Sequence, residues 1–240
     1  MTGSSPAQVS AEAPSADRSS AEHSSTETTP RFLVVLDADS TLIHDEVIEL
    51  LAEEAGARTE VADITERAMR GELDFEQSLR ERVKTLAGLP VDVFARVGGR
   101  IRVTDGVPEL IAGVHAAGGR VGVVSGGFHE TLDPLAKRLD LDHWRANRLE
   151  VVDGALTGDL LGDVVDADAK AAALLDWAKD AGIPLPRTVA IGDGANDLKM
   201  MAVAGLAVAF NAKPRVRAEA DVVVDRQDLS QILPLLGLRG

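Results

Sequence analysis

The stretch Arg31-Phe-Leu-Val-Val-Leu-Asp37-Ala-Asp39-Ser-Thr-Leu42 decides the fold class of this chain. The five consecutive apolar residues before Asp37 are typical of a short strand buried on both faces, as in parallel sheets flanked by helices. Ligands collect at the carboxyl ends of the strands in such sheets. Asp37 stands at that end and Asp39 just beyond it. The pair predicts a reaction centre, although the same residues taken alone are equally consistent with a polar turn.

A second acidic cluster favours the reaction centre. In Thr188-Val-Ala-Ile-Gly192-Asp193-Gly194-Ala-Asn196-Asp197 an apolar strand again ends in aspartate. Because Mg²⁺ prefers oxygen ligands and leaves positions for water and a phosphate, two strands that end in Asp predict a magnesium site. A third strand is predicted over 120–125, and Gly126 and Gly127 follow it. These glycines and the Ser125 hydroxyl predict a phosphate cradle of backbone N–H groups.

The other patterns alternate between strands and helices. Apolar residues at helical spacing predict helices over 107–117, 130–139 and 169–181. Further strands are expected near Leu206 and Asp221. This alternation predicts an α/β fold with a doubly wound parallel sheet. An Asp-Gly pair between two β-type runs, in the segment 149–157, predicts a hairpin.

Residues 45–104 are longer than one crossover between parallel strands requires. Their apolar residues recur at helical spacing, so we expect a small helical domain inserted after the first strand. The catalytic core is then expected to comprise 31–44 and 105–240. Residues 1–30 are rich in Ser, Thr, Ala, Glu and Pro, and they predict a disordered tail without a signal peptide or membrane anchor.

The composition narrows the classes of function. A net charge of −14 argues against nucleic-acid binding, which requires clustered Lys and Arg. It also means that a phosphate site must supply its own local cations and N–H groups. The chain has no Cys, so disulfides are excluded and metal ligands must be oxygen or nitrogen. We expect a cytoplasmic enzyme, a monomer or homodimer, with a small-molecule substrate and no nucleic-acid or membrane partner.

The acidic motifs resemble, in order and spacing, the four motifs of the haloacid dehalogenase superfamily of phosphatases. Within it, the chain is similar to the phosphoserine phosphatases from about Phe32 to the region of Asp225. The matched motifs of the superfamily are Asp37-x-Asp39-x-Thr41-Leu42, Ser125-Gly-Gly, Lys170 and Gly192-Asp193-Gly194-x-Asn196-Asp197. The matched details of the narrower family are Glu46, Met69, Gly71-Glu-Leu-Asp-Phe75, Arg82 and Ser125-Gly-Gly-Phe128. The resemblance implies that 45–104 are a helical cap that closes over the active site.

The resemblance also implies roles for the matched residues. Asp37 is expected to be the nucleophile, since a carboxylate beside Mg²⁺ can form an aspartyl phosphate. Asp39 is expected to protonate the leaving oxygen and then to activate water, which requires a raised pKa. The expected metal ligands are the carboxylates of Asp37 and Asp193 and the backbone carbonyl of Asp39, with Asp197 as an orienting group. The expected substrate-binding residues are Glu46, Arg82, Ser125, Gly126, Lys170 and Asn196.

The implied substrate is O-phosphoserine, which carries an ammonium and a carboxylate besides its phosphate. Arg82 and Glu46 supply the complementary charges, with Met69 and Phe75 as apolar lining. Without the resemblance, Lys170 would be read as a solvated charge, and Met69 and Phe75 as core residues. The expected reaction is Mg²⁺-dependent hydrolysis to serine and phosphate, the final step of serine biosynthesis. Two alternatives stay open: a phosphatase of the same superfamily for another small phosphomonoester, and a catalytically dead binding protein.

Overall fold

The computed structural model describes residues 1–3 and 31–238 of the 240-residue chain. The predicted disordered tail falls almost entirely on residues 4–30, which lie outside the described residues. The described residues contain a seven-stranded sheet in the order β4-β3-β2-β1-β5-β6-β7. Its strands are β1 (Leu33–Leu36), β2 (Arg120–Phe128), β3 (His143–Val152), β4 (Ala155–Leu161), β5 (Thr188–Gly192), β6 (Leu206–Phe210) and β7 (Val222–Val224).

The sheet is parallel except at β4, which pairs with β3 in the antiparallel sense. The exception is the predicted hairpin, which is confirmed. Its two loop residues, Asp153 and Gly154, have φ angles of 50° and 79°, as a tight two-residue turn requires. Because so short a loop can join only antiparallel neighbours, the chain adds one antiparallel edge strand to the predicted parallel sheet.

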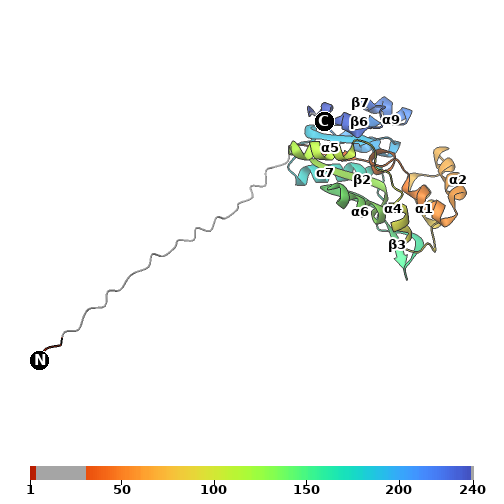
Figure 1. Ribbon diagram of the computed structural model, residues 1–240. Helices are drawn as coiled ribbons and strands as arrows, with labels where there is room; N and C mark the ends of the chain where they lie inside the picture. Colours follow the sequence, from red (N-terminus) through yellow and green to blue (C-terminus); the bar gives the residue numbers. More distant parts are fainter. Residues whose placement is uncertain (4–30, 239–240) are drawn as a thin grey trace.

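Helices cover both faces of the sheet, which confirms the predicted doubly wound arrangement (Figure 1). Alternate residues of β1 enter two separate apolar cores, because successive side chains of a strand point to opposite faces. One face is covered by α5 (Val107–Ala116), α6 (His129–Leu139) and a short helix, Leu229–Leu236. The other face is covered by α7 (Ala167–Asp180), α8 (Leu198–Val203) and α9 (Pro214–Glu219).

Four helices lie between β1 and α5, in residues 45–104, which we call the helical insertion. They are α1 (Val47–Ala55), α2 (Arg58–Met69), α3 (Phe75–Lys84) and α4 (Val93–Gly98). Figure 1 shows α1 and α2, in orange, to one side of the sheet. Helix α3 begins with a capping box, in which Asp74 accepts from the Gln77 N–H and the Gln77 side chain accepts from the Asp74 N–H. That the helical insertion behaves as a separate cap domain stays a prediction.

The end of the helical insertion is bonded to the β3–β4 hairpin. The Gly88 N–H donates to the Leu156 carbonyl at 2.8 Å, and the Leu156 N–H donates to the Leu89 carbonyl at 2.8 Å. The Val91 N–H donates to the Gly154 carbonyl at 3.0 Å. The insertion is therefore attached to the sheet through backbone hydrogen bonds as well as through the chain itself. Among the described helices, none combines the length and the apolar character needed to cross a membrane.

Candidate active site

The two acidic motifs and the predicted phosphate cradle lie at the ends of three neighbouring strands. Strand β1 lies between β2 and β5, and Leu36 is paired with Val123 on one side and Ile191 on the other. The Asp37 N–H donates to the Ile191 carbonyl at 2.9 Å, which holds the residue at the end of β1. The order of the strands reverses around β1, and ligands bind at such positions in open α/β sheets. The three predicted motifs therefore meet at one edge of the sheet.

Three buried carboxylates form a cluster at this edge. One oxygen from each of Asp37, Asp193 and Asp197 lies within 4.8 Å of the others. The buried Lys170 Nζ donates to Asp37 Oδ1 at 2.5 Å and to Asp197 Oδ1 at 2.7 Å. One ammonium cannot neutralise three carboxylates, and the donor set is all oxygen. The residues therefore fit a hard divalent cation. Asp197, which was expected only to orient the site, lies close enough to Asp37 and Asp193 to contact the same cation.

Two acids of the cluster, Asp37 and Asp193, have raised pKa values. Burial raises the pKa of Asp37 to about 7, and the neighbouring Asp197 adds to the rise while Lys170 opposes it. Burial and Asp197 likewise raise the pKa of Asp193 to about 6, against the attraction of Lys213. Burial favours the neutral amine of Lys170, but the carboxylates of Asp197 and Asp37 outweigh it and raise the pKa of Lys170. Without a further cation, these shifts favour protonation of Asp37 and Asp193.

Asp39 lies in the turn Ala38–Leu42, which leads out of β1. Its Oδ1 is buried and has no hydrogen-bond partner among the described residues. Burial, with help from the carboxylates of Glu46 and Asp37, raises the pKa of Asp39 well above its usual range. Ser40 has a left-handed backbone (φ 58°), and its hydroxyl donates to Glu46 Oε1 at 2.8 Å. The raised pKa favours the protonated form of Asp39, which the predicted acid–base role requires.

The predicted phosphate cradle lies at the end of β2. The Gly127 N–H donates to Ser125 Oγ at 2.8 Å. A Cβ placed on Gly127 would lie 3.0 Å from Ser125 Oγ and 3.5 Å from Asp39 Oδ2. A Cβ on Gly126 would lie 2.9 Å from the ring of Phe75, which belongs to α3. Both glycines are therefore required for close packing, and the helical insertion reaches the cradle.

A cavity of about 540 Å³ joins these elements. Of the predicted residues it is lined by Asp37, Asp39, Glu46, Arg82, Ser125, Gly126, Asp193 and Asn196. Lys170 is absent from the lining because its side chain is fully buried beneath Asp37 and Asp197. The structure thus shows Lys170 as the counter-ion of Asp37 and Asp197, and its contact with a phosphate stays a prediction.

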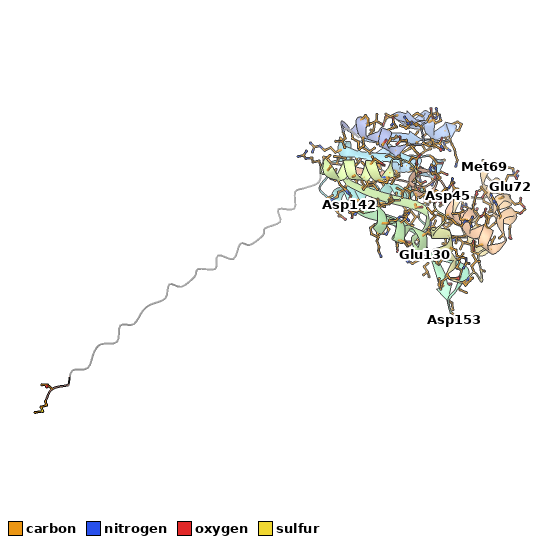
Figure 2. The ribbon with its side chains drawn as sticks, viewed as in Figure 1. Asp45, Met69, Glu72, Glu130, Asp142 and Asp153 are labelled. Carbon is orange, nitrogen blue, oxygen red and sulfur yellow. The ribbon has the colours of Figure 1, made fainter. Side chains whose placement is uncertain are left out.

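The helical insertion supplies the opposite wall of the cavity. Arg82 projects from α3, and its Nε donates to the Ser78 carbonyl at 3.2 Å. Burial lowers the pKa of Arg82, while the carboxylates of Glu46 and Asp39 oppose that shift. Phe75 is partly buried, but Met69 at the end of α2 is 82% exposed and lies at the outside of the molecule (Figure 2). Met69 therefore contributes to the rim of the cavity and not to its interior.

Two further residues belong to the site and were missed in the sequence. The Lys213 N–H donates to the Asp193 carbonyl at 3.0 Å, and its Nζ lies 3.8 Å from Asp193 Oδ2. The sequence feature that could have identified Lys213 is its position shortly after β6, at the same edge of the sheet. Asn147 is buried in β3, and its Nδ2 donates to the Gly126 carbonyl at 2.8 Å. No pattern in the sequence distinguishes Asn147 from other polar residues of a strand.

Comparison with known proteins agrees with this geometry. The family model of haloacid dehalogenase-like hydrolases matches residues 34–202. A phosphoserine phosphatase of Streptococcus thermophilus is 53% identical over 204 residues, which cover 85% of this chain and 95% of that protein. One of Mycobacterium tuberculosis is 51% identical over 206 residues, 86% of this chain but only 50% of that protein.

Solved structures match as well. A phospho-aspartyl intermediate analogue of phosphoserine phosphatase superposes with a TM-score of 0.81 at 45% identity, covering 86% of this chain and 99% of that one. A substrate-bound phosphoserine phosphatase complex gives the same score and identity, with 85% and 98% covered. These matches and the four motifs at one sheet edge lead to a single conclusion. The chain belongs to the haloacid dehalogenase-like hydrolases.

Proposed function

We propose that this chain is a Mg²⁺-dependent phosphatase that hydrolyses O-phosphoserine to serine and phosphate through an aspartyl phosphate on Asp37. The observation that carries the proposal is a single cavity lined on one side by Asp37 and Asp39 and on the other by Arg82 and Glu46. The substrate-bound and phospho-aspartyl structures of similar proteins support it. The reaction would complete serine biosynthesis.

The first half-reaction transfers the phosphoryl group to the protein. A phosphate monoester needs a nucleophile, an acid for its leaving oxygen and positive charge around its other oxygens. The Asp37 carboxylate attacks phosphorus, and the bond between phosphorus and the serine oxygen breaks. Asp39, which its raised pKa keeps protonated, gives its proton to that oxygen. Mg²⁺ held by the carboxylates of Asp37 and Asp193 and by the backbone carbonyl of Asp39, with Asp197 close by, would supply positive charge and favour ionised Asp37 over the neutral form.

The second half-reaction releases phosphate. Asp39 is now a carboxylate and takes a proton from a water molecule as that water attacks phosphorus. The bond between phosphorus and Asp37 breaks, so that the Asp37 carboxylate and the protonated Asp39 are both restored. In this proposal the Ser125 hydroxyl and the Gly126 N–H hold the phosphate oxygens through both steps, while the Gly127 N–H is bonded to Ser125 Oγ. Lys170 keeps the Asp37 carboxylate oriented through its 2.5 Å contact.

The charged side chains on the cavity wall from the helical insertion would select O-phosphoserine. The planar guanidinium of Arg82 suits the substrate carboxylate, and the Glu46 carboxylate suits the substrate ammonium. Both side chains are partly buried, so these contacts would form with little competing water. A phosphomonoester without the ammonium and carboxylate would leave both groups without a partner, which is unfavourable.

The decisive experiment is a panel of phosphomonoesters assayed with Mg²⁺ and with excess chelator. We expect kcat/KM for phosphoserine to exceed that for phosphoethanolamine, which lacks the carboxylate, by at least about tenfold. Chelator should abolish turnover, and Mg²⁺ should raise the Tm of the chelated protein. Equal values across the panel would favour a phosphatase for another small phosphomonoester. No turnover of any member would favour a binding protein. A cytoplasmic location and a monomeric or homodimeric state stay predictions.

A further inference from the structure

Strand β2 is irregular where it forms the phosphate cradle. Val124 pairs with Arg145 of β3, but the next paired residue of β2 is Phe128, opposite Asn147. Three residues of β2, 125–127, therefore face a single residue of β3, and the ladder between the strands is interrupted. Buried backbone groups that lose ladder partners must find others.

Side chains replace the lost partners. The Ala146 N–H donates to His129 Nε2 at 3.1 Å, and the Gly126 carbonyl accepts from Asn147 Nδ2 at 2.8 Å. Asn147 Oδ1 accepts from the Val165 N–H at 2.8 Å. Because a carbonyl lies at one end of the amide and an N–H at the other, only one orientation of Asn147 satisfies both.

The amide of Asn147 fixes the peptide between Gly126 and Gly127. The carbonyl of that peptide accepts from Asn147, and its N–H donates to Ser125 Oγ at 2.8 Å. A hydroxyl oxygen that accepts this bond directs its own proton elsewhere, and Ser125 lines the cavity. The hydrogen bonds thus form a chain from Asn147 through one peptide to a hydroxyl that faces the substrate, and such chains strengthen each member.

We propose that Asn147 is a positioning residue for the phosphate, acting through the Gly126–Gly127 peptide and the Ser125 hydroxyl. It also ties the cradle to Val165 and so to the start of α7, the helix that carries Lys170. The inference rests on the proposed phosphatase activity but not on its preference for phosphoserine. Its test therefore uses p-nitrophenyl phosphate as substrate and inorganic phosphate as competitor.

The test replaces the amide by an isosteric acid, Asn147→Asp. The ionised carboxylate can accept from the Val165 N–H but cannot donate to the Gly126 carbonyl, whereas the protonated acid can do both. Burial disfavours the ionised form, so protonation begins well above the usual range of Asp. We expect kcat/KM to fall by about 10- to 100-fold at pH 8. The ratio of variant to wild type should climb as the pH is lowered to 5.5, and the inhibition constant of phosphate should recover in parallel.

Asn211→Asp is the matched control, because it adds the same charge at an exposed position. Its ratio to wild type should stay flat with pH. A flat ratio for Asn147→Asp would overturn the proposal, because restoring the hydrogen bond to the Gly126 carbonyl would then have no effect on activity. Failure of the wild type to hydrolyse any phosphomonoester, phosphoserine included, would instead overturn the proposed function, and the two failures are therefore distinguishable.

A double-mutant cycle decides the matter if Asn147→Asp does not fold. Asn147→Ala is compared in the wild type and in Ser125→Ala, with kcat/KM and the inhibition constant of phosphate as readouts. If Asn147 acts through Ser125, the loss caused by Asn147→Ala should shrink several-fold once the hydroxyl is gone. Equal losses in both backgrounds would show that the two residues act independently and would overturn the proposal.

Discussion

The two walls of the cavity are built differently. The wall at the sheet edge holds Lys170, with no exposed surface, between Asp37 and Asp197, which follow parallel strands that are themselves fully buried. The wall from the helical insertion holds Arg82 through one bond to its own helix, and Met69 is 82% exposed. The groups that would do chemistry are fixed by a sheet, and those that would select the substrate are fixed by surface helices.

The difference predicts that chemistry and selectivity are separable in this protein. Changes in the sheet-edge wall should affect every phosphomonoester, since all share the phosphate that reacts there. Changes in the wall from the insertion should affect only substrates with further charged groups. Each of the following variants changes only one of the two walls.

The largest effect is expected for Asp37→Asn. The amide is not a nucleophile towards phosphorus, so kcat for phosphoserine and for p-nitrophenyl phosphate should both fall by about 10⁴-fold or more. Asp168→Asn, which changes an exposed partner of Lys199, is the control and should retain full activity. Detection of an acid-stable phosphoenzyme that maps to another residue would disprove the assignment of the nucleophile.

Asp39→Asn should lower kcat by about 10²- to 10⁴-fold, because it removes the acid–base group but not the nucleophile. The loss in formation of the phosphoenzyme should be larger for phosphoserine than for p-nitrophenyl phosphate, whose leaving group needs no proton. In the wild type, the acid form of Asp39 is present below its raised pKa and is lost as the pH rises through it. Acid-quenched single turnovers across pH measure both effects, and equal losses on the two substrates would contradict the role.

Lys170→Met tests how far the sheet-edge wall depends on its one buried cation. Removing one partner of a buried ion pair leaves carboxylates without compensation, and we expect the free energy of unfolding to fall by about 3 kcal/mol in chelator. Lys199→Met removes an exposed ion pair and should cost less than about 0.5 kcal/mol. Urea denaturation of both variants makes the measurement. Similar losses of unfolding free energy in the two variants would show that the buried ion pairs of Lys170 contribute no more to stability than an exposed ion pair.

Arg82→Ala and Glu46→Ala test the wall from the insertion. Each removes a charge-assisted contact with phosphoserine, so kcat/KM for that substrate should fall by about 10²-fold. Hydrolysis of p-nitrophenyl phosphate, which has no group to meet either side chain, should change little. Arg80→Ala, on the exposed side of the same helix, is the control for Arg82. Equal losses on both substrates would mean that the two walls are not separable.

The smallest effect is expected for Met69→Ala. A side chain so exposed contributes little burial, so kcat/KM for phosphoserine should change by less than about threefold. A loss of tenfold or more would show that α2 moves onto the substrate when it binds. The sheet-edge wall would then be fixed, and the wall from the helical insertion would close over the substrate.

The sequence predicted the sheet-edge wall well because local patterns specify it. Runs such as Phe32 to Leu36 identify buried strands, and parallel pairing brings their carboxyl ends to one edge. Contacts between distant segments were not predictable in this way. The burial of Lys170 depends on how α7 packs against β2 and α8, and its sequence neighbours indicate a solvated helix. Asn147 was invisible because its partner, the Gly126 carbonyl, is freed only by a three-residue irregularity in β2.

The bonds between the helical insertion and the β3–β4 hairpin have a consequence for the solubility of the protein. Strand β4 ends the sheet, and an open edge strand is a template for pairing with another chain. Here the backbone of residues 88–91 occupies part of that template, through Gly88, Leu89 and Val91. The segment that shapes the cavity therefore also shields the sheet from aggregation. A chain trimmed of its insertion would lose both one wall of the cavity and the cover of its edge strand.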